Sequence, residues 1–365
     1  MDMTSHEDVF DMPETRQPTI LSVYNQKGGV GKTTTSVNLA LALAALGKSV
    51  VLIDFDPQSS ATSNFLLRDK AKVGINDLLR QETFVEDAIT PTAFDGLSMI
   101  VGARKLYSLE HALDSRGGSQ RGLRKALHFS RNPPDYVVID CPPALGHLAA
   151  GALAASDRLI VPVFPGRYAL DGLRRTLQVV EHIQNGLNPG LTLAGILMLS
   201  ITNDDVGRDS LTQVRGEFPN LMFRTAFPYD VDVVKATYRR MPAAIFTPEG
   251  RTTARFAALA WEIVHGRGAA PDEAQLKPAL ERIRSWHEAT DTSYSARRAS
   301  SLDEGDEPSG GGNGVRQAER AGARSGGGAG MRAGLVGLVV GLAGGFALGA
   351  AVGQPILGRL LGLGG

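Results

Sequence analysis

The chain has 365 residues, and its 38 lysines and arginines balance 38 aspartates and glutamates, so the formal net charge is zero. Overall charge therefore gives no argument for nucleic-acid binding, and any basic patch must be local. Hydrophobic residues make up 43% of the chain, an ordinary share for a packed core, and the length suits one large α/β domain with appendages. A single cysteine, Cys141, excludes an intramolecular disulfide framework and fits a reducing cytosol.

The pattern changes after a polar and acidic N-terminal stretch, residues 1–18, which lacks the apolar run of a signal peptide. We expect a disordered arm there. The apolar run at 20–24 has the length of a strand, and a glycine-rich turn follows at 28–31. A helical pattern then extends from Thr34 to Leu46, with Gly47 placed to end the helix.

A strand, a glycine-rich turn and a helix in this order form the context of a phosphate-binding loop. Glycines let backbone amides converge on phosphate oxygens beside the positive end of the helix. Lys32 can reach the β- and γ-phosphates, and the Thr33 hydroxyl can ligate Mg²⁺. The sequence therefore predicts a nucleotide site, and the residues expected to bind the nucleotide are Gly28, Gly29, Val30, Gly31, Lys32, Thr33 and Thr34.

Carboxylates follow two further apolar runs. Residues 48–55 indicate a buried parallel strand with Asp54 and Asp56 at its end. Residues 135–143 indicate another, which ends in Asp140. Because ligands of open α/β sheets bind at the carboxyl ends of the strands, these side chains are candidates for the site. Asp140 has the place of a Walker B carboxylate, which binds Mg²⁺ through water.

The chain up to residue 266 continues to alternate between strand and helix patterns. Further strands are predicted at 97–101, 158–163, 192–199 and 222–226. Helices are predicted at 144–155, 173–185, 209–218 and 256–265.

The phosphate loop departs from the standard G-x-x-x-x-G-K-T pattern, because Gln26 stands at its first glycine and Lys27 precedes the glycines. This deviant loop, DFDPQ at 54–58 and DCPP at 140–143 together resemble the ParA/MinD family of dimeric ATPases, the ParA branch in particular. The resemblance covers roughly residues 19–266. It implies an α/β P-loop NTPase fold, a doubly wound, mostly parallel sheet with helices on both faces.

The resemblance also implies residue roles. Lys27 would cross to the nucleotide of the partner subunit and stabilise charge there, much as an arginine finger does. Asp56 would position or activate the attacking water, and Asp54 would lie beside the phosphates and the metal. The implied catalytic residues are Lys27, Lys32 and Asp56, and the implied metal site comprises Thr33, Asp54 and Asp140.

Two more segments are implied to form the adenine pocket. Asn203 matches a position near the base. Pro228 begins a P-x-N-V-like segment that contributes backbone to the base pocket. Asp230 replaces the asparagine that is usual in this segment, which is a departure from the family pattern.

The function implied is an ATP-dependent homodimer with ATP and Mg²⁺ that hydrolyses ATP to position or segregate DNA or another cargo, with a ParB-like stimulating partner. The alternative is a MinD-like or membrane-anchored scaffold that uses ATP as a switch with little turnover. Iron-protein reductases share the loop but need two cysteines, and tyrosine kinases of this fold carry a C-terminal tyrosine cluster that this chain lacks.

Non-specific DNA is one candidate surface for the dimer. In this reading basic side chains contact phosphates, and a solvated face is the alternative because aspartates are interleaved with them. The basic candidates are Arg208, Arg215, Arg224, Lys235, Arg239 and Arg240, and the interleaved aspartates are Asp204, Asp205, Asp209, Asp230 and Asp232.

The region after residue 266 has a different composition. We expect a helical extension at 267–287, a Ser- and Gly-rich linker at 288–330 and a hydrophobic tail at 331–365. Residues 333–353 carry no charged or polar side chain, and a helix of that length just spans a ~30 Å hydrocarbon core. Glycines occur there at every fourth position, namely Gly337, Gly341, Gly345, Gly349 and Gly353.

Two interpretations of this tail stay open. The glycine spacing favours a membrane segment in which helices approach closely, which would tether a cytoplasmic ATPase domain to the inner membrane. So many glycines also lower helix propensity, so a disordered or self-associating tail is the alternative.

Overall fold

The structure is a computed structural model that describes residues 17–303 apart from 68–70, 104–105, 107–121 and 128–131. Two compact units are distinguished, residues 1–290 with 354–365 and residues 291–353, and all described strands belong to the first. The predicted arm, apart from its last residues, and the predicted tail lie outside the described residues. Within the described residues no helix is long and apolar enough to cross a bilayer.

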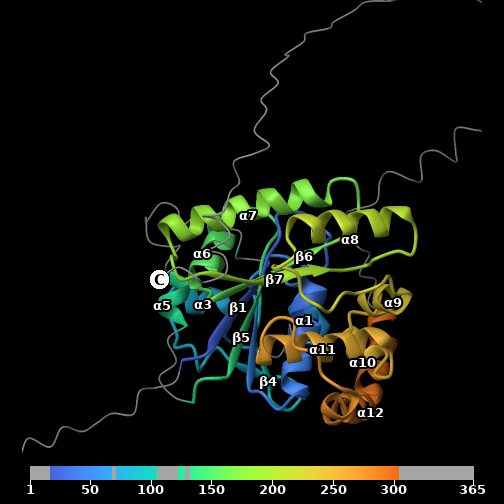
Figure 1. The fold of residues 1–365 in the computed structure, drawn as a ribbon. Coiled ribbons are helices and arrows are strands. Elements are labelled where there is room, and N and C mark those ends of the chain that lie inside the picture. The colour runs from blue at the N-terminus through green and yellow to red at the C-terminus, as the bar shows by residue number, and fades with distance from the viewer. Residues whose placement is uncertain (1–16, 68–70, 104–105, 107–121, 128–131, 304–365) are drawn as a thin grey trace, which may run out of the picture. The chain divides into compact units, whose positions relative to one another are not determined.

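Seven strands form one sheet in the described part of the chain, in the order β3-β4-β2-β5-β1-β6-β7 (Figure 1). Only the pairing of β3 with β4 is antiparallel. The strands are β1 (Thr19–Val23), β2 (Val50–Asp54), β3 (Thr90–Pro91), β4 (Leu97–Ile100), β5 (Tyr136–Asp140), β6 (Arg158–Val163) and β7 (Thr192–Met198). The doubly wound, mostly parallel sheet predicted from the sequence is confirmed.

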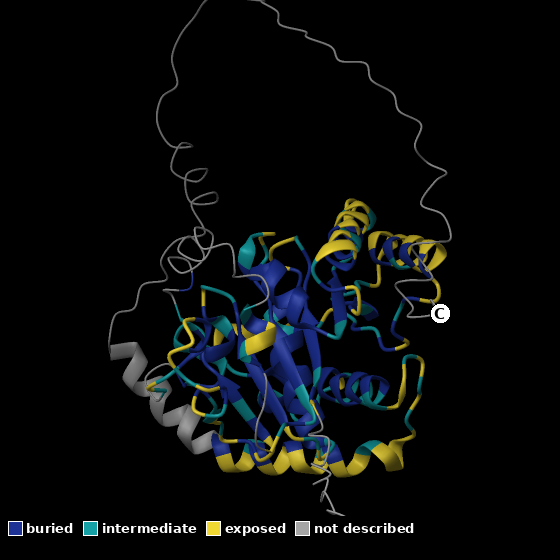
Figure 2. Cartoon of the chain, turned by 90° about the vertical axis from the view of Figure 1, so that its left-hand side faces the viewer, coloured by how far each residue is buried: buried dark blue, intermediate teal, exposed yellow. Residues whose placement is uncertain are grey.

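The central strands are buried because their side chains are apolar on both faces. Every residue of β2 is buried, and so are four of the five residues of β1 and of β5. A strand covered on both faces has no polar side to alternate with, which is why these strands appear as near-continuous apolar runs. Figure 2 shows this buried centre, with exposed surface on the outer faces of the helices.

Helices cover both faces of the sheet. Residues of α1, α10, α11 and α12 share one apolar cluster, and residues of α3, α5, α6, α7 and α8 share the other. The helices are α1 (Lys32–Ala45), α2 (Ser60–Asn64), α3 (Ile75–Leu79), α5 (Gly122–Ala126), α6 (His147–Ala155), α7 (Ala169–Gly186), α8 (Asp205–Glu217), α9 (Val231–Tyr238), α10 (Ala243–Phe246), α11 (Arg251–His265) and α12 (Glu273–Asp303).

The C-terminal extension packs on the α/β domain through α12. Its Trp286 ring lies 5.5 Å from the Phe94 ring in an edge-to-face contact, and Arg282 donates to the Ala44 carbonyl at 3.2 Å. The helix continues to Asp303, so the prediction of a flexible linker beginning at residue 288 is wrong for the stretch 288–303. The chain has no glycine or proline between Pro278 and Gly305, so nothing in this stretch breaks the helix.

The predicted strand at 222–226 is also wrong. Met222 forms only an isolated bridge with Ile196 of β7. Phe223 N still donates to the Ile196 carbonyl of β7 at 3.0 Å, but the ladder is then interrupted, because the Glu262 carboxylate of α11 accepts from Arg224 N at 3.0 Å and Thr225 N at 2.7 Å. A buried side chain therefore satisfies backbone groups that the sequence pattern assigned to a sheet.

We predict that Glu262 is a main stabilising residue of this region. It is fully buried, and it also accepts from Gly268 N at 3.0 Å. Glu262→Ala leaves three amides without an acceptor, so the free energy of unfolding should fall by at least about 2 kcal/mol in urea titration. Glu281→Ala, at an exposed 3.9 Å ion pair, should change it by less than about 0.5 kcal/mol. Equal urea midpoints for the two variants would contradict this role.

Candidate functional site

Three strand ends meet where the glycine loop begins. The loop follows β1, Asp54 ends β2 and Asp140 ends β5. The register pairs Asp54 with Asp140 and Asp140 with Val23, so both carboxylates lie at the carboxyl edge beside the loop. The sequence predicted this grouping from the strand pattern alone.

The loop has a backbone that only glycine adopts easily. Gly29 has φ +72° and Gly31 has φ +81°, both in the left-handed region. A Cβ on Gly31 would lie 2.8 Å from Leu199 Cδ1, so a larger residue there would also require the leucine side chain to move. Gly31 is the N-cap of α1, and the loop therefore delivers its amides to the N-terminus of a 14-residue helix, a natural place for an anion.

Lys32 lies at the inner side of this loop with 7% of its surface exposed. Its Nζ donates to the carbonyls of Asn25 and Lys27, each at 3.1 Å. Burial lowers the pKa of Lys32, while the nearby carboxylates of Asp140 and Asp56 act in the opposite direction. Phosphate oxygens would offer this ammonium charged acceptors in place of neutral carbonyls.

Thr33 and Asp140 are in direct contact. The Thr33 hydroxyl donates to Asp140 Oδ2 at 2.7 Å, and the Ser36 hydroxyl donates to Oδ1 at 3.0 Å. Burial, and next the charge of Asp54, raise the pKa of Asp140 to about 8, and the two hydroxyl contacts oppose that rise. Ser36 was not predicted as a site residue from the sequence. It follows Thr33 by three residues on a helix, which puts both on one face, and this spacing was a signal that could have identified it.

Asp54 bonds to the segment after β2 rather than to the glycine-rich loop. Its Oδ2 accepts from both the amide and the hydroxyl of Thr62 at 2.7 Å. Burial is the main cause that raises the pKa of Asp54 to about 6. A Cβ on Gly102 would lie 2.8 Å from Asp54 Cγ, so the segment after β4 packs directly on the carboxylate. Asp54 therefore holds together the loops that surround the site.

The residues present fit a hydrated Mg²⁺ bound mainly through a nucleotide. Within the described residues, no group of three or more His, Cys, Asp or Glu side chains could hold a metal by itself. Mg²⁺ at phosphate sites commonly keeps waters and takes few protein ligands. The Thr33 hydroxyl and the adjacent Asp140 supply such a partial ligand set.

The two other predicted catalytic residues, Asp56 and Lys27, differ in exposure. Asp56 is half-buried, and its Oδ1 accepts from Gln58 N at 2.9 Å. Burial raises the pKa of Asp56, and the charge of Lys32 opposes this rise. Lys27 is exposed, and its backbone amide donates to Asn25 Oδ1 at 3.0 Å.

The two segments predicted to contact the base are neighbours. Ile201 pairs with Pro228 in a parallel bridge, and Tyr229 N donates to the Ile201 carbonyl at 2.9 Å. Asn203, two residues after this bridge, is exposed and accepts from Arg208 at 3.2 Å.

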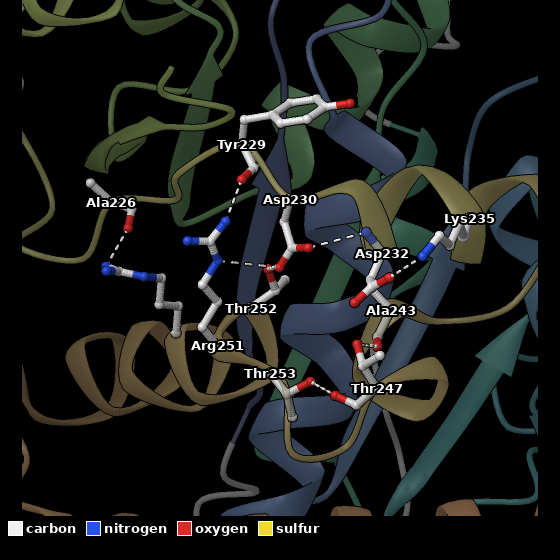
Figure 3. Close-up of polar contacts among 11 residues, drawn as sticks. Ala226, Tyr229, Asp230, Asp232, Lys235, Ala243, Thr247, Arg251, Thr252 and Thr253 are labelled. Carbon is white, nitrogen blue, oxygen red and sulfur yellow. Dashed lines mark hydrogen bonds and ion pairs between the residues drawn. The ribbon is translucent and has the colours of Figure 1, made fainter. Parts of the chain in front are cut away.

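The departure at Asp230 has a structural explanation (Figure 3). Its carboxylate caps α9 by accepting from Asp232 N at 3.1 Å, and it accepts from the Thr252 hydroxyl of α11 at 2.6 Å. Arg251 adds an ion pair at 3.7 Å and donates to the Tyr229 carbonyl at 2.6 Å. The side chain therefore fixes the backbone of this segment to α11.

The basic candidates for a DNA surface are partly paired with the interleaved aspartates. Arg208 and Lys235 each form an ion pair at 2.9 Å, with Asp205 and Asp232 respectively. The guanidinium of Arg239 lies 4.8 Å from the ring centre of Phe246. Ion pairs between exposed side chains are weak, so these cations stay able to exchange partners.

Comparison with known proteins gives one family. An AAA domain family (AAA_31) matches residues 18–193. The sporulation initiation inhibitor protein Soj of Bacillus subtilis is 36% identical over 247 residues, 67% of this chain and 97% of Soj. The chromosome partitioning protein ParA of Myxococcus xanthus is 31% identical over 247 residues, 67% of this chain and 87% of ParA.

Solved structures agree with this assignment. Cobyrinic acid a,c-diamide synthase of Mycobacterium smegmatis, with a bound ATP analogue and magnesium, has a TM-score of 0.60 at 28% identity, covering 68% of this chain and 94% of that one. The septum site-determining protein MinD of Pyrococcus horikoshii, complexed with Mg-ADP, has a TM-score of 0.57 at 26% identity, covering 68% and 96%. With its deviant loop and this similarity, the chain belongs to the ParA/MinD family of P-loop ATPases.

Proposed function

We propose that this chain binds ATP with Mg²⁺ and hydrolyses it to ADP and phosphate as a dimerisation switch. The observation that carries the proposal is the junction of the glycine loop, the buried Lys32 and the Thr33–Asp140 contact at 2.7 Å. Amides, one ammonium and a hydroxyl–carboxylate pair match the triphosphate and its metal in charge. The solved relatives with a bound ATP analogue and magnesium, or with Mg-ADP, support the same ligands here.

Each residue has a separate role in the proposed reaction. The loop amides and Lys32 hold the phosphates, and Thr33 holds the metal with Asp140 behind it. The metal supplies charge neutralisation when bound. Asp56 orients the attacking water from its half-buried position, and Asp54 keeps the surrounding loops in place through Thr62.

The proposed dimer places Lys27 at the nucleotide of the partner. Its side chain is exposed, and a Cβ on Gly28 or Gly29 would meet no heavy atom within 4 Å, so the outer side of the loop is open. An open loop beside an exposed lysine suits a second subunit that covers the nucleotide. The ammonium then supplies charge from across the interface, as an arginine finger does.

The proposed biological task is to segregate or position DNA or another cargo, with a ParB-like partner that stimulates hydrolysis. The relative from Myxococcus xanthus is named a chromosome partitioning protein, which supports this choice over placement of a septum. Basic residues of α8, α9 and the turn after α9 would contact DNA phosphates. A scaffold that binds ATP with little turnover is the alternative.

Alanine variants of the two loop lysines test the proposal. Lys32→Ala should weaken ATP binding by roughly 100-fold, because it removes a buried charge that pairs with phosphate. Lys27→Ala should leave ATP binding within about twofold but lower turnover at least about tenfold. Fluorescent ATP titration and phosphate release measure the two effects.

Lys277→Ala, an exposed lysine of α12, is the control and should match the unmodified protein in both assays. Turnover that is negligible in the unmodified protein while ATP still binds would favour the scaffold. ATP binding that survives Lys32→Ala unchanged would contradict the site itself.

Ser36 provides a second test, because it holds the carboxylate behind the metal. Ser36→Ala should raise the Mg²⁺ concentration needed for half-maximal turnover by about tenfold, as removal of outer partners of metal ligands does. Binding of ATP without Mg²⁺ should stay unchanged. Ser285→Ala on α12 is the matched control. An unchanged Mg²⁺ requirement in Ser36→Ala would contradict the proposed role of Ser36 in holding Asp140 for the metal.

We also propose that residues 333–353 anchor the protein in the inner membrane, on the strength of their apolar composition and glycine spacing. The full chain should then resist carbonate extraction from membranes, and a version that ends at Arg324 should become soluble. If both versions are extracted, the tail is no anchor and ATP-dependent DNA binding becomes the expected activity.

A further inference from the structure

Helix α7 reaches the phosphate loop through one buried hydroxyl, that of Thr176. The residue is fully buried, and its Oγ1 lies 3.2 Å from Asn25 Oδ1. It also lies 3.0 Å from the Gly172 carbonyl, one turn earlier in the same helix. Thr176 is 150 residues from the loop in sequence, and neither the motifs nor the proposed mechanism gives it a role.

Asn25 has a fixed orientation between three partners. It is 3% exposed, and its Nδ2 donates to the Pro162 carbonyl of β6 at 2.8 Å. This leaves Oδ1 as the acceptor for the Lys27 amide at 3.0 Å. Because Oδ1 accepts, the Thr176 hydroxyl is the donor in their contact. The hydroxyl of α7 therefore bonds to the same oxygen that holds the backbone of Lys27.

The segment 25–27 is thereby held from two sides. The Gln26 amide points to Thr176 Oγ1 at 3.5 Å, a long contact that adds to the bond with Asn25. On the inner side, Lys32 Nζ donates to the carbonyls of Asn25 and Lys27. A shift of the backbone in this segment would displace the Cα of Lys27 and with it the Lys27 side chain. The glycine amides and the backbone of Lys32 lie outside the segment.

We propose that Thr176 is a positioning residue for hydrolysis, which acts through Asn25 to direct Lys27 toward the nucleotide of the partner subunit. The inference rests on the proposed role of Lys27 across the dimer. Displacements of about 1 Å in a catalytic group can cost on the order of 100-fold in rate, so one buried hydrogen bond at the base of Lys27 is enough to matter.

Thr176→Val tests the contact with Asn25 because it removes the hydroxyl with little change in side-chain shape. The hydroxyl has the Gly172 carbonyl as an alternative acceptor, and valine has nearly the same shape as threonine. In Thr176→Val the amide oxygen of Asn25 keeps its bond to the Lys27 amide. The variant therefore removes the bond to Asn25 and the long contact from the Gln26 amide, while the acceptor of the Lys27 amide stays in place.

The experiment compares Thr176→Val, Thr176→Ser, Lys27→Ala and the double variant Thr176→Val/Lys27→Ala in the full chain. Thr176→Val should lower kcat about five- to tenfold, the effect of one hydrogen bond on the barrier, with KM for ATP within about twofold. Thr176→Ser should restore most of kcat. In the Lys27→Ala background the valine should cause no further loss, because both changes act on one side chain.

A second readout does not depend on turnover. Hydrogen exchange of the peptide that contains the Lys27 amide should be faster in Thr176→Val than in the unmodified protein. Thr192→Val, the same change at the start of β7 away from the loop, is the control and should alter neither exchange there nor kcat.

Three outcomes would overturn the inference. Equal losses from Thr176→Val with and without Lys27 would show that the hydroxyl acts elsewhere. An unchanged kcat in Thr176→Val, with Lys27→Ala impaired, would remove Thr176 alone and leave the proposed function standing. An unchanged kcat in Lys27→Ala would remove the role of Lys27 across the dimer and this inference with it.

Discussion

The site depends on the burial of two carboxylates at neighbouring strand ends. Asp54 and Asp140 are register partners on β2 and β5, and neither has any exposed surface. Burial of ionised groups without partners is costly, which is why the pKa of Asp54 is raised to about 6 and that of Asp140 to about 8. The hydroxyls that donate to these carboxylates, and the nearby ammonium of Lys32, partly offset this cost.

The two carboxylates have different partners and therefore different roles. Asp54 accepts hydrogen bonds from the amide and the hydroxyl of Thr62, so its role is structural. Asp140 takes its bonds from Thr33 and Ser36, both on the first turns of the helix that follows the phosphate loop. A dication next to Asp140 would favour the charged carboxylate that burial alone disfavours. A metal-bound nucleotide beside Asp140 would therefore stabilise the buried negative charge of this carboxylate.

The parts that could be predicted from sequence are those in which local pattern and fold agree. The glycine loop, the apolar strands and the carboxylates at their ends follow from turn chemistry, burial and strand polarity. The strand at 222–226 could not be excluded, because Glu262, which accepts from the amides of Arg224 and Thr225, lies in a helix 37 residues beyond Thr225. Thr176 likewise carries no local signal, since its partner Asn25 is 151 residues away.

The replacement at Asp230 has structural contacts of its own in this chain. The segment from Pro228 is proposed to meet the base through its backbone, so the side chain at 230 is free to do other work. In this chain that work is to bond α11 and cap α9, and Arg251 and Arg255 hold the carbonyls of Tyr229 and Ala226. A carboxylate suits this surrounding better than an amide, because every group around it is a donor. The carboxylate at position 230 therefore links the segment from Pro228 to α9 and α11.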